Sequence, residues 1–182
     1  MAANTYKCTT DLMAYMRFKK SMHTIATEVS YNYCISDVLG ERKGKIHEYE
    51  VKISIQDMKR DFYKLIGIQN RRVKKADLSK YKGYLKHEVY NSKKPGCFVP
   101  HYFYFVVPPE LEEAALKVCK KCKKYGVLVW DPSAIKLEYK FRSAKRPSAL
   151  NKEVLNKRVV SKIIKRASSE LINLRMKKVE GA

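Results

Sequence analysis

The chain has 182 residues, of which 39 are Lys or Arg and 18 are Asp or Glu, so its formal net charge is +21 at pH 7. This length predicts one domain with room for an appendage, and a hydrophobic fraction of 45% is sufficient for a buried core. No apolar run of about 18 residues is present, which excludes a membrane-spanning helix.

The excess of positive charge favours a polyanionic partner. It extends over the body of the chain as well as its C-terminal tail. A field of this sign attracts nucleic acid, because each phosphate neutralised by a lysine or arginine releases a counterion. We therefore expect DNA as the partner. A membrane surface, an acidic protein or a merely soluble basic surface are the alternatives.

The cysteines predict no disulfide framework. They are odd in number, and residues 1–11 are polar and lack the apolar stretch of a signal peptide. We expect reduced thiols in a cytoplasmic protein of a bacterial or phage-host cytosol. Cys119 and Cys122 have a spacing found in zinc sites, which Cys97 and His101 could complete. A cysteine in a predicted helix is more often a packing residue.

The first third of the chain predicts a helix followed by a strand hairpin. Residues 11–23 have a partly helical apolar pattern, with Asp11 as the expected cap. Three segments rich in β-branched and aromatic residues predict strands over 24–33, 34–39 and 46–54. The polar turn at 41–45 joins the last two strands as a hairpin. A helix is expected next, over 57–65.

The remaining segments alternate between buried strands and helices. Residues 67–100 are polar, basic and not readable as an element. After them we expect a buried strand at 102–107, a helix at 109–122, a strand at 126–130 and an edge strand at 135–141. The resulting order predicts an α/β domain with a mixed sheet flanked by helices, over residues 1–141. Residues 142–182 are expected to form a long basic helical extension, since apolar residues recur there near every 3.6 positions.

One strand carries the residues that indicate chemistry. In a strand, residues two apart share a face, so Glu50, Lys52 and Ser54 would lie together while Val51 and Ile53 face the core. A carboxylate, an amine and a hydroxyl in this arrangement can hold a divalent metal beside a phosphodiester.

The acid-x-Lys spacing alone is weak, because it occurs four times in this lysine-rich chain. Glu50 differs from the other three acids in following a hairpin turn and in having an acid, Asp37, on the partner strand. The simpler alternative is that Glu50 and Lys52 are exposed strand residues that pair with cross-strand neighbours.

The order of these residues resembles that of the PD-(D/E)XK nuclease superfamily, and more closely that of its MmcB-like DNA-repair branch and related phage proteins. In that branch, two strands carrying Glu and Asp precede a glycine turn, a Glu-Val-Lys-x-Ser strand and a helix that begins near an Asp. The matching residues here are Ile25 to Glu28, Ile35 to Val38, Gly44, Glu50 to Ser54, and Asp57-Met58. The arginine usual near the aspartate is replaced by Cys34 or Ser36.

The resemblance implies a restriction-endonuclease-like fold and a Mg²⁺- or Mn²⁺-dependent deoxyribonuclease for DNA repair, recombination or phage DNA processing. Asp37 and Glu50 would bind the metal, with the Val51 carbonyl as a third ligand. Lys52 would orient the attacking water or stabilise the transition state. Glu28 would be a further ligand or a base. Ser54 and Asp57 are candidates for support around this site. A non-catalytic nucleic-acid-binding module or a basic adaptor protein are the alternatives.

Several basic residues outside this strand are candidates for DNA contact. Lys86 and His87 could touch the scissile phosphate or act as a general acid, although a lone histidine in a basic loop is more often a surface residue. Lys93 and Lys94 lie in a stretch that interleaves lysines with tyrosines, which suits backbone contact and base stacking. The C-terminal helix would dock DNA through four side chains: Arg158, Lys162, Lys165 and Arg166. Alternatively, its apolar face packs on the domain or forms a homodimer.

Overall fold

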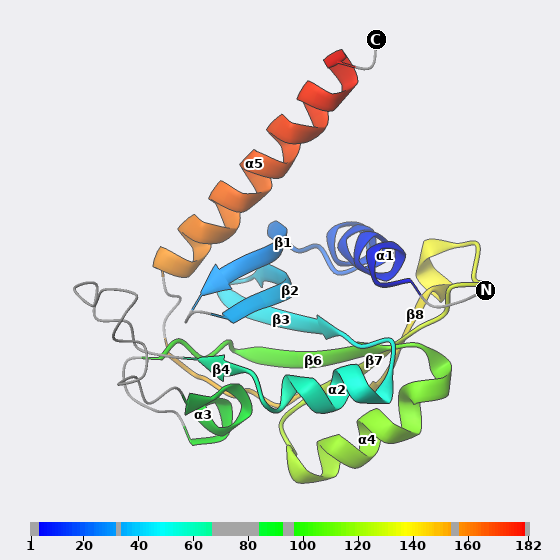
Figure 1. The fold of residues 1–182 in the computed structure, drawn as a ribbon, viewed down its shortest axis with the longest axis vertical. Coiled ribbons are helices and arrows are strands. Elements are labelled where there is room, and N and C mark those ends of the chain that lie inside the picture. The colour runs from blue at the N-terminus through cyan, green and yellow to red at the C-terminus, as the bar shows by residue number, and fades with distance from the viewer. Residues whose placement is uncertain (1–3, 32–33, 67–83, 93–96, 154–156, 181–182) are drawn as a thin grey trace.

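The computed structural model describes residues 4–31, 34–66, 84–92, 97–153 and 157–180. A six-stranded sheet forms its centre, with the strand order β1-β2-β3-β6-β7-β8 (Figure 1). The strands are β1 (Thr24–Tyr31), β2 (Cys34–Arg42), β3 (Lys45–Val51), β6 (Tyr102–Val107), β7 (Gly126–Trp130) and β8 (Phe141–Lys145). A separate pair joins β4 (Leu65–Ile66) to β5 (Tyr84–Leu85).

The sheet is mixed, as the sequence predicted. Strands β1, β2 and β3 form an antiparallel meander, β3 and β7 both run parallel to β6, and β8 returns antiparallel to β7. The helices are α1 (Thr5–Phe18), α2 (Ile55–Asp61), α3 (Lys86–Ser92), α4 (Glu112–Lys121) and α5 (Lys157–Glu180). Two 3₁₀ turns, η2 (Pro109–Leu111) and η3 (Leu137–Tyr139), precede α4 and β8.

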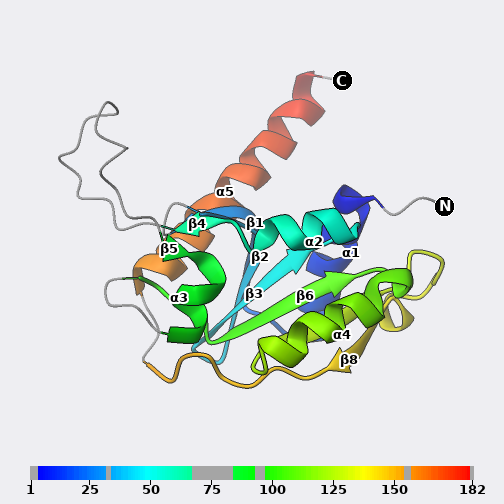
Figure 2. The same ribbon diagram turned by 60° about the horizontal axis from the view of Figure 1, so that its bottom comes forward.

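Helices cover both faces of the sheet, so both sets of alternating side chains are buried. On one face, Tyr49, Val51 and Leu128 pack with Leu12 and Tyr15 of α1. On the other face, α2, α3 and α4 lie below β6 and β7 in Figure 1, and Figure 2 brings α4 in front of them. The side chains packed there include Phe103, Phe105, Val127, Ala115 and Cys119. This double burial is typical of parallel strands joined by helical crossovers.

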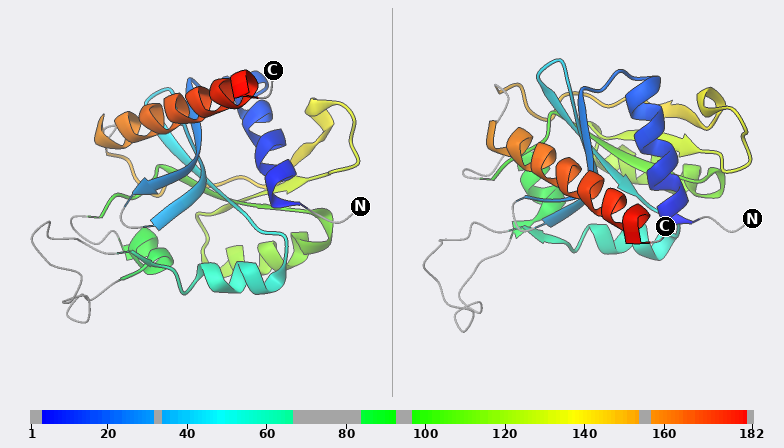
Figure 3. Two further views of the ribbon diagram at one scale, coloured as in Figure 1. Left: turned by 45° about the horizontal axis from the view of Figure 1, so that its top comes forward. Right: turned by 90° about the horizontal axis from the view of Figure 1, so that it is seen from above.

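Helix α5 runs along the edge strand β1 (Figure 3), and its C-terminal half projects beyond the sheet in the view of Figure 1. Its first turns bury Val159 and Ile163 against Ala26 and Leu39. Further along, apolar side chains of α5 are exposed: Leu171, Ile172, Leu174 and Met176. Within the described residues, no helix combines the length and apolar character needed to cross a membrane.

Several predicted elements differ from the structure, among them the helix expected over 57–65, which is α2 over Ile55–Asp61. Helix α1 begins at Thr5 because Asn4 caps it, whereas Asp11 accepts hydrogen bonds from Trp130 and Lys140 instead of capping. The edge strand predicted over 135–141 is wrong: the edge strand is β8, which begins where the prediction ends and includes residues past the expected domain boundary. The C-terminal helix starts at Lys157, several residues later than its apolar pattern suggested.

A candidate active site of buried charges

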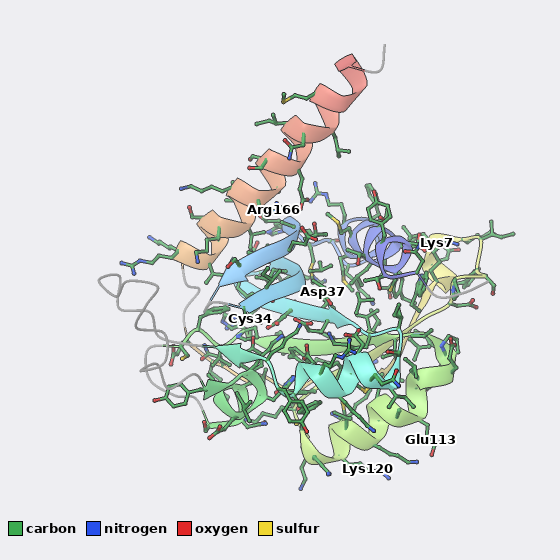
Figure 4. The ribbon with its side chains drawn as sticks, viewed as in Figure 1. Lys7, Cys34, Asp37, Glu113, Lys120 and Arg166 are labelled. Atoms are coloured by element: carbon green, nitrogen blue, oxygen red, sulfur yellow. The ribbon has the colours of Figure 1, made fainter. Side chains whose placement is uncertain are left out.

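The candidate site lies where β2 and β3 separate. Their ladder runs from Arg42 paired with Lys45 to Val38 paired with Tyr49, so Asp37 lies just beyond the last paired residue. There the Asp37 side chain replaces the missing strand partner: Val51 N donates to Asp37 Oδ2 at 2.8 Å. This bond fixes the aspartate beside the carboxyl end of β3. Figure 4 shows Asp37 in the strand layer near the centre of the molecule.

The three residues of the predicted motif are in contact. Lys52 Nζ lies 2.9 Å from Glu50 Oε2 and 3.9 Å from Asp37 Oδ2. Glu50 is fully buried and Lys52 nearly so, while the Asp37 side chain is 30% exposed. The Lys52 backbone N donates to Val106 O at 2.9 Å, which ties it to β6. The sequence therefore identified a real cluster, although the cluster is buried and not on a solvated strand face.

Helix α2 and the residues after it add a second acid and a second amine. Ser54 caps α2 by accepting from Asp57 N, which orients the helix so that its last residue, Asp61, points to the strands. Asp61 Oδ1 lies 3.1 Å from Lys52 Nζ and 2.7 Å from Lys64 Nζ. Lys64 Nζ also donates to Glu50 Oε2 at 2.8 Å. Each carboxylate thus shares its charge with two amines.

Helix α3 completes the cluster from the other side. Lys86 Nζ is 2.6 Å from Glu50 Oε1 and 2.7 Å from Glu48 Oε1. Its neighbour His87 joins Asp61 Oδ2 at 2.8 Å through Nε2 and the Tyr125 hydroxyl at 2.9 Å through Nδ1. Glu50 is therefore surrounded by amines, with Lys52 and Lys64 at one oxygen and Lys86 at the other.

Glu48, a fully buried acid of the cluster, is held by hydroxyl groups as well as by an amine. Tyr90 OH donates to Glu48 Oε2 at 2.6 Å and Ser36 Oγ donates to Glu48 Oε1 at 2.9 Å. All three residues are buried. Because buried carboxylates are costly unless paired and hydrogen-bonded, these contacts explain how several acids can share one interior.

The pKa values separate Asp37 from the other acids. Burial, and then the charge of Glu50, raises the pKa of Asp37 to about 7, although Lys52 opposes this. Burial alone would raise the pKa of Glu50 too, but Lys86 and the other amines hold it below its ordinary value. The pKa of Lys52 is raised despite its burial because Glu50, Asp61 and Asp37 stabilise the ammonium. The cluster has more carboxylate than amine charge, and Asp37 carries the excess.

Asp37 and Lys52 also line a pocket that opens to solvent. Its volume is about 420 Å³. The remaining lining residues come from α1, the end of β3 and α2: Thr5, Val51, Ile53, Ser54, Asp57, Arg60 and Lys64. Glu50 lies behind this wall. The pocket thus brings two carboxylates, two ammonium groups and a guanidinium into one small space.

Glu28 is not part of this cluster, contrary to the prediction. Its φ of 48° lies in the left-handed region and interrupts the alternation of β1. The Glu28 side chain is 70% exposed and pairs with Arg166 at 2.7 Å on α5, at the position labelled in Figure 4. The alternation of side chains along a strand does not predict a residue whose backbone is left-handed, so the side to which Glu28 points could not be predicted.

The predicted DNA-contacting residues divide into three groups. Lys86 and His87 are 0% and 3% exposed and belong to the buried cluster, so the prediction of solvent-facing phosphate contacts is wrong for both. Lys93 and Lys94 lie outside the described residues. On α5, Arg158 and Lys165 are exposed, Lys162 donates to Ser30 O at 3.1 Å, and Arg166 pairs with Glu28.

Sequence reasoning missed Glu48, Asp61 and Lys64. Glu48 could have been found, because the same two-residue period that joins Glu50 to Lys52 also places Glu48 on that face. Asp61 and Lys64 depend on the crossing of α2 over the sheet, which no local pattern records.

The donor set indicates where a hard cation would fit. Among the described residues, no three acidic, imidazole or thiol side chains converge on one point. Both Glu50 oxygens accept from lysines, but Asp37 is accessible, lines the pocket and has a raised pKa that a cation would lower. Asp37 therefore suits a hard cation. For Glu50 to become a second ligand, its contacts with the lysines would have to rearrange.

The thiols do not form the alternative zinc site. Cys119 and Cys122 pack in the core beside α4. His101 engages both ring nitrogens, Nδ1 with Ile46 N at 3.0 Å and Nε2 with Glu153 O at 2.9 Å.

Comparison with protein-family models, curated proteins and solved structures finds no match to this chain.

Proposed function

We propose that the protein is a metal-dependent nuclease that hydrolyses phosphodiester bonds in DNA. The observation that carries this proposal is the convergence of Asp37, Glu50 and Lys52 at an open pocket, with Asp37 and Lys52 in its wall and Glu50 behind them. Two acids beside one lysine are what the resemblance to PD-(D/E)XK nucleases implied. Repair, recombination or phage DNA processing are the settings that fit that resemblance.

The order of elements supports the same family. Strand β1 precedes β2 with Asp37, a turn at Gly44, β3 with Glu50, and helix α2 capped by Ser54. A mixed sheet with helices on both faces is also what the family requires. A restriction-endonuclease-like fold is therefore part of this proposal.

Each residue has a defined role in the proposed reaction. Asp37 would hold Mg²⁺ or Mn²⁺, joined by Glu50 and the Val51 carbonyl after the lysine contacts of Glu50 rearrange. A divalent cation bound there would lower the pKa of its water and neutralise charge on the phosphate. Lys52 stays protonated beside both acids and would stabilise charge that develops on the phosphate oxygens. Arg60 and Lys64 at the pocket wall would attract the DNA backbone.

A cleavage assay with Mn²⁺ tests the proposal on single-stranded, duplex and branched DNA and on RNA. Wild-type protein should cut at least one DNA form, whereas Lys52→Met and Asp37→Asn should lose cleavage by about a hundredfold or more and retain DNA affinity. Lys59→Met is the matched control, because Lys59 lies exposed on α2 and should keep full activity. Absence of cleavage on every substrate, or activity that survives in Lys52→Met with its fold intact, would overturn the proposal.

A non-catalytic nucleic-acid-binding module is the second candidate. The observation that favours it is the complete pairing of Glu50 with amines from Lys52, Lys64 and Lys86, which resembles a structural ion cluster. In this case the protein binds DNA with an affinity that falls as the salt concentration rises, and it cuts no DNA. Binding that does not weaken between low and moderate salt would instead favour the basic adaptor protein.

A further inference from the structure

A second pocket lies on the α1 face of the sheet, opposite the buried charges. Its volume is about 640 Å³, within the range of about 300–1,000 Å³ typical of small-ligand sites. Side chains alternate along β3, so Tyr49 faces this pocket while Glu48 and Glu50 face the other side. Its lining comes from α1, the β2–β3 hairpin, the sheet and the segment after β8. The residues that the argument uses are Arg42, Lys43, Lys45, His47, Tyr102 and Tyr104.

The charge of this pocket is entirely positive. Its lining includes Lys20, Arg42, Lys43, Lys45 and Arg146, and no aspartate or glutamate. In the part of the chain that the structure describes, none of these five side chains forms an ion pair. The nearby acid of the hairpin, Glu41, instead accepts from Gly44 N at 2.6 Å and lies 3.5 Å from His23. The pocket therefore has unneutralised cations suited to a phosphate.

The wall between these cations is aromatic. His47 and Tyr102 are register partners on β3 and β6, with ring centroids 4.7 Å apart, and the next partners, Tyr49 and Tyr104, are 4.8 Å apart at an interplanar angle of 17°. Four rings thus form a ladder across two neighbouring strands. Gly126 on β7 makes room for it, since a Cβ there would lie 2.7 Å from Tyr104 Cδ1.

This combination restricts the ligand. A phosphate alone needs the cations but not a wall of rings, and an apolar ligand needs the rings but not the cations. Stacking of nucleobases on aromatic side chains, together with a basic groove for the backbone, is how proteins hold unpaired strands. A base inside a duplex already stacks on its neighbours and presents only its edges, so the base must be unpaired.

We propose that this pocket binds a nucleotide of single-stranded nucleic acid, with the base against the aromatic ladder of β3 and β6 and the phosphate at the hairpin cations. The inference shares with the proposed function only the choice of nucleic acid as ligand, and it does not require cleavage. A strand bound here would occupy the opposite face of the sheet from Asp37.

Binding to a fluorescent single-stranded oligonucleotide in EDTA tests the pocket without any contribution from cleavage. The double substitution Arg42→Gln/Lys45→Gln, and separately Tyr102→Leu, should each weaken binding by about tenfold or more. Lys120→Gln/Lys124→Gln removes the same charge from the region of α4, on the far side of the sheet in Figure 4, and should weaken binding clearly less. Duplex of the same length should depend little on Tyr102.

Photocrosslinking distinguishes the sources of the nucleotide. A 5-bromouracil oligonucleotide should crosslink to peptides that contain β3 or β6, as mapped by mass spectrometry. Protection by dAMP at concentrations where phosphate has no effect would show that a free nucleotide is sufficient. Protection only by a second oligonucleotide would show that a strand is needed.

Three results would overturn the inference, each independent of whether the protein cuts DNA. These are equal losses in the two double variants, crosslinks confined to other elements, or displacement by phosphate as effective as by nucleotide.

Discussion

Asp37 is the residue whose chemistry depends most on its surroundings. It lies at the edge of a buried ion cluster, keeps partial access to solvent, and has its pKa raised to about 7 by burial and by Glu50. The other acids of the cluster, Glu48, Glu50 and Asp61, each pair with at least one amine. An accessible acid with an unbalanced charge is the place where a cation would stabilise the fold most.

The raised pKa of Asp37 gives a prediction for stability against pH. Its ordinary pKa is 3.8, so between about pH 4 and pH 7 the folded protein binds the Asp37 proton more tightly than the unfolded chain does. The stability due to this group is therefore present at low pH and is lost as pH rises through about 7. Asp37→Asn cannot ionise, so its free energy of unfolding relative to wild type should increase by about 2 kcal/mol or more from pH 4 to pH 8. Urea unfolding at both pH values checks this, and a pH-independent difference would contradict it.

Glu50 gives a prediction for stability at a fixed pH. Glu50→Gln removes the anion shared by Lys52, Lys64 and Lys86, and should lower the free energy of unfolding by about 3–5 kcal/mol, the usual cost of leaving buried charges unpaired. Glu113→Gln is the control, since Glu113 on α4 forms only an exposed pair and should unfold like wild type. If Glu50→Gln and wild type unfolded at the same midpoint denaturant concentration, the prediction would be contradicted. Water would then reach the three lysines and replace the lost carboxylate.

At this scale the sequence predicted the central contacts but not their environment. The spacing of Glu50 and Lys52 and the position of Asp37 sufficed to bring these three together. The burial of Lys86 and His87 could not be predicted, because it depends on α3 packing under β6 after a stretch without readable pattern. The prediction that Glu28 joins the cluster was wrong because the backbone of Glu28 itself is left-handed within β1.

At the level of elements, the strands were the most predictable. Runs of β-branched and aromatic residues located β1, β6 and β7 closely. For β6 and β7 this is because both faces of these central strands are largely buried and their composition records it. Helix ends were less predictable, since they depend on the caps at Asn4 and Ser54. The edge strand β8 was missed because its burial is low and its sequence is correspondingly polar.

The packing of helix α5 on strands β1 and β2 gives a prediction for stability. Ile163 is fully buried against β1 and β2, whereas its neighbour Ile164 is 49% exposed. Ile163→Ala should therefore lower the free energy of unfolding by about 2–4 kcal/mol, and Ile164→Ala by less than about 0.5 kcal/mol. Thermal or urea unfolding measures both. Equal effects would mean that α5 does not dock on the sheet through this face.

On the scale of the whole molecule, the two faces of the sheet have different chemistry. One face encloses carboxylates and amines in nearly balanced numbers and opens beside Asp37. The opposite face holds a pocket whose lining includes lysines, arginines and tyrosines and no aspartate or glutamate. With a net charge of +21, the molecule attracts polyanions and repels metal cations in general. A metal ion that binds despite this field must be held by a specific acidic site.

Binding of Mn²⁺, followed by the loss of its free-ion electron paramagnetic resonance signal, tests the central claim most directly. Wild-type protein is expected to bind Mn²⁺ at pH 8 and more weakly at pH 6, where a proton occupies Asp37 because its pKa is about 7. Asp37→Asn should bind at least about tenfold more weakly at pH 8. No binding by wild type, or equal binding by wild type and Asp37→Asn, would contradict the assignment of a metal-dependent centre at Asp37.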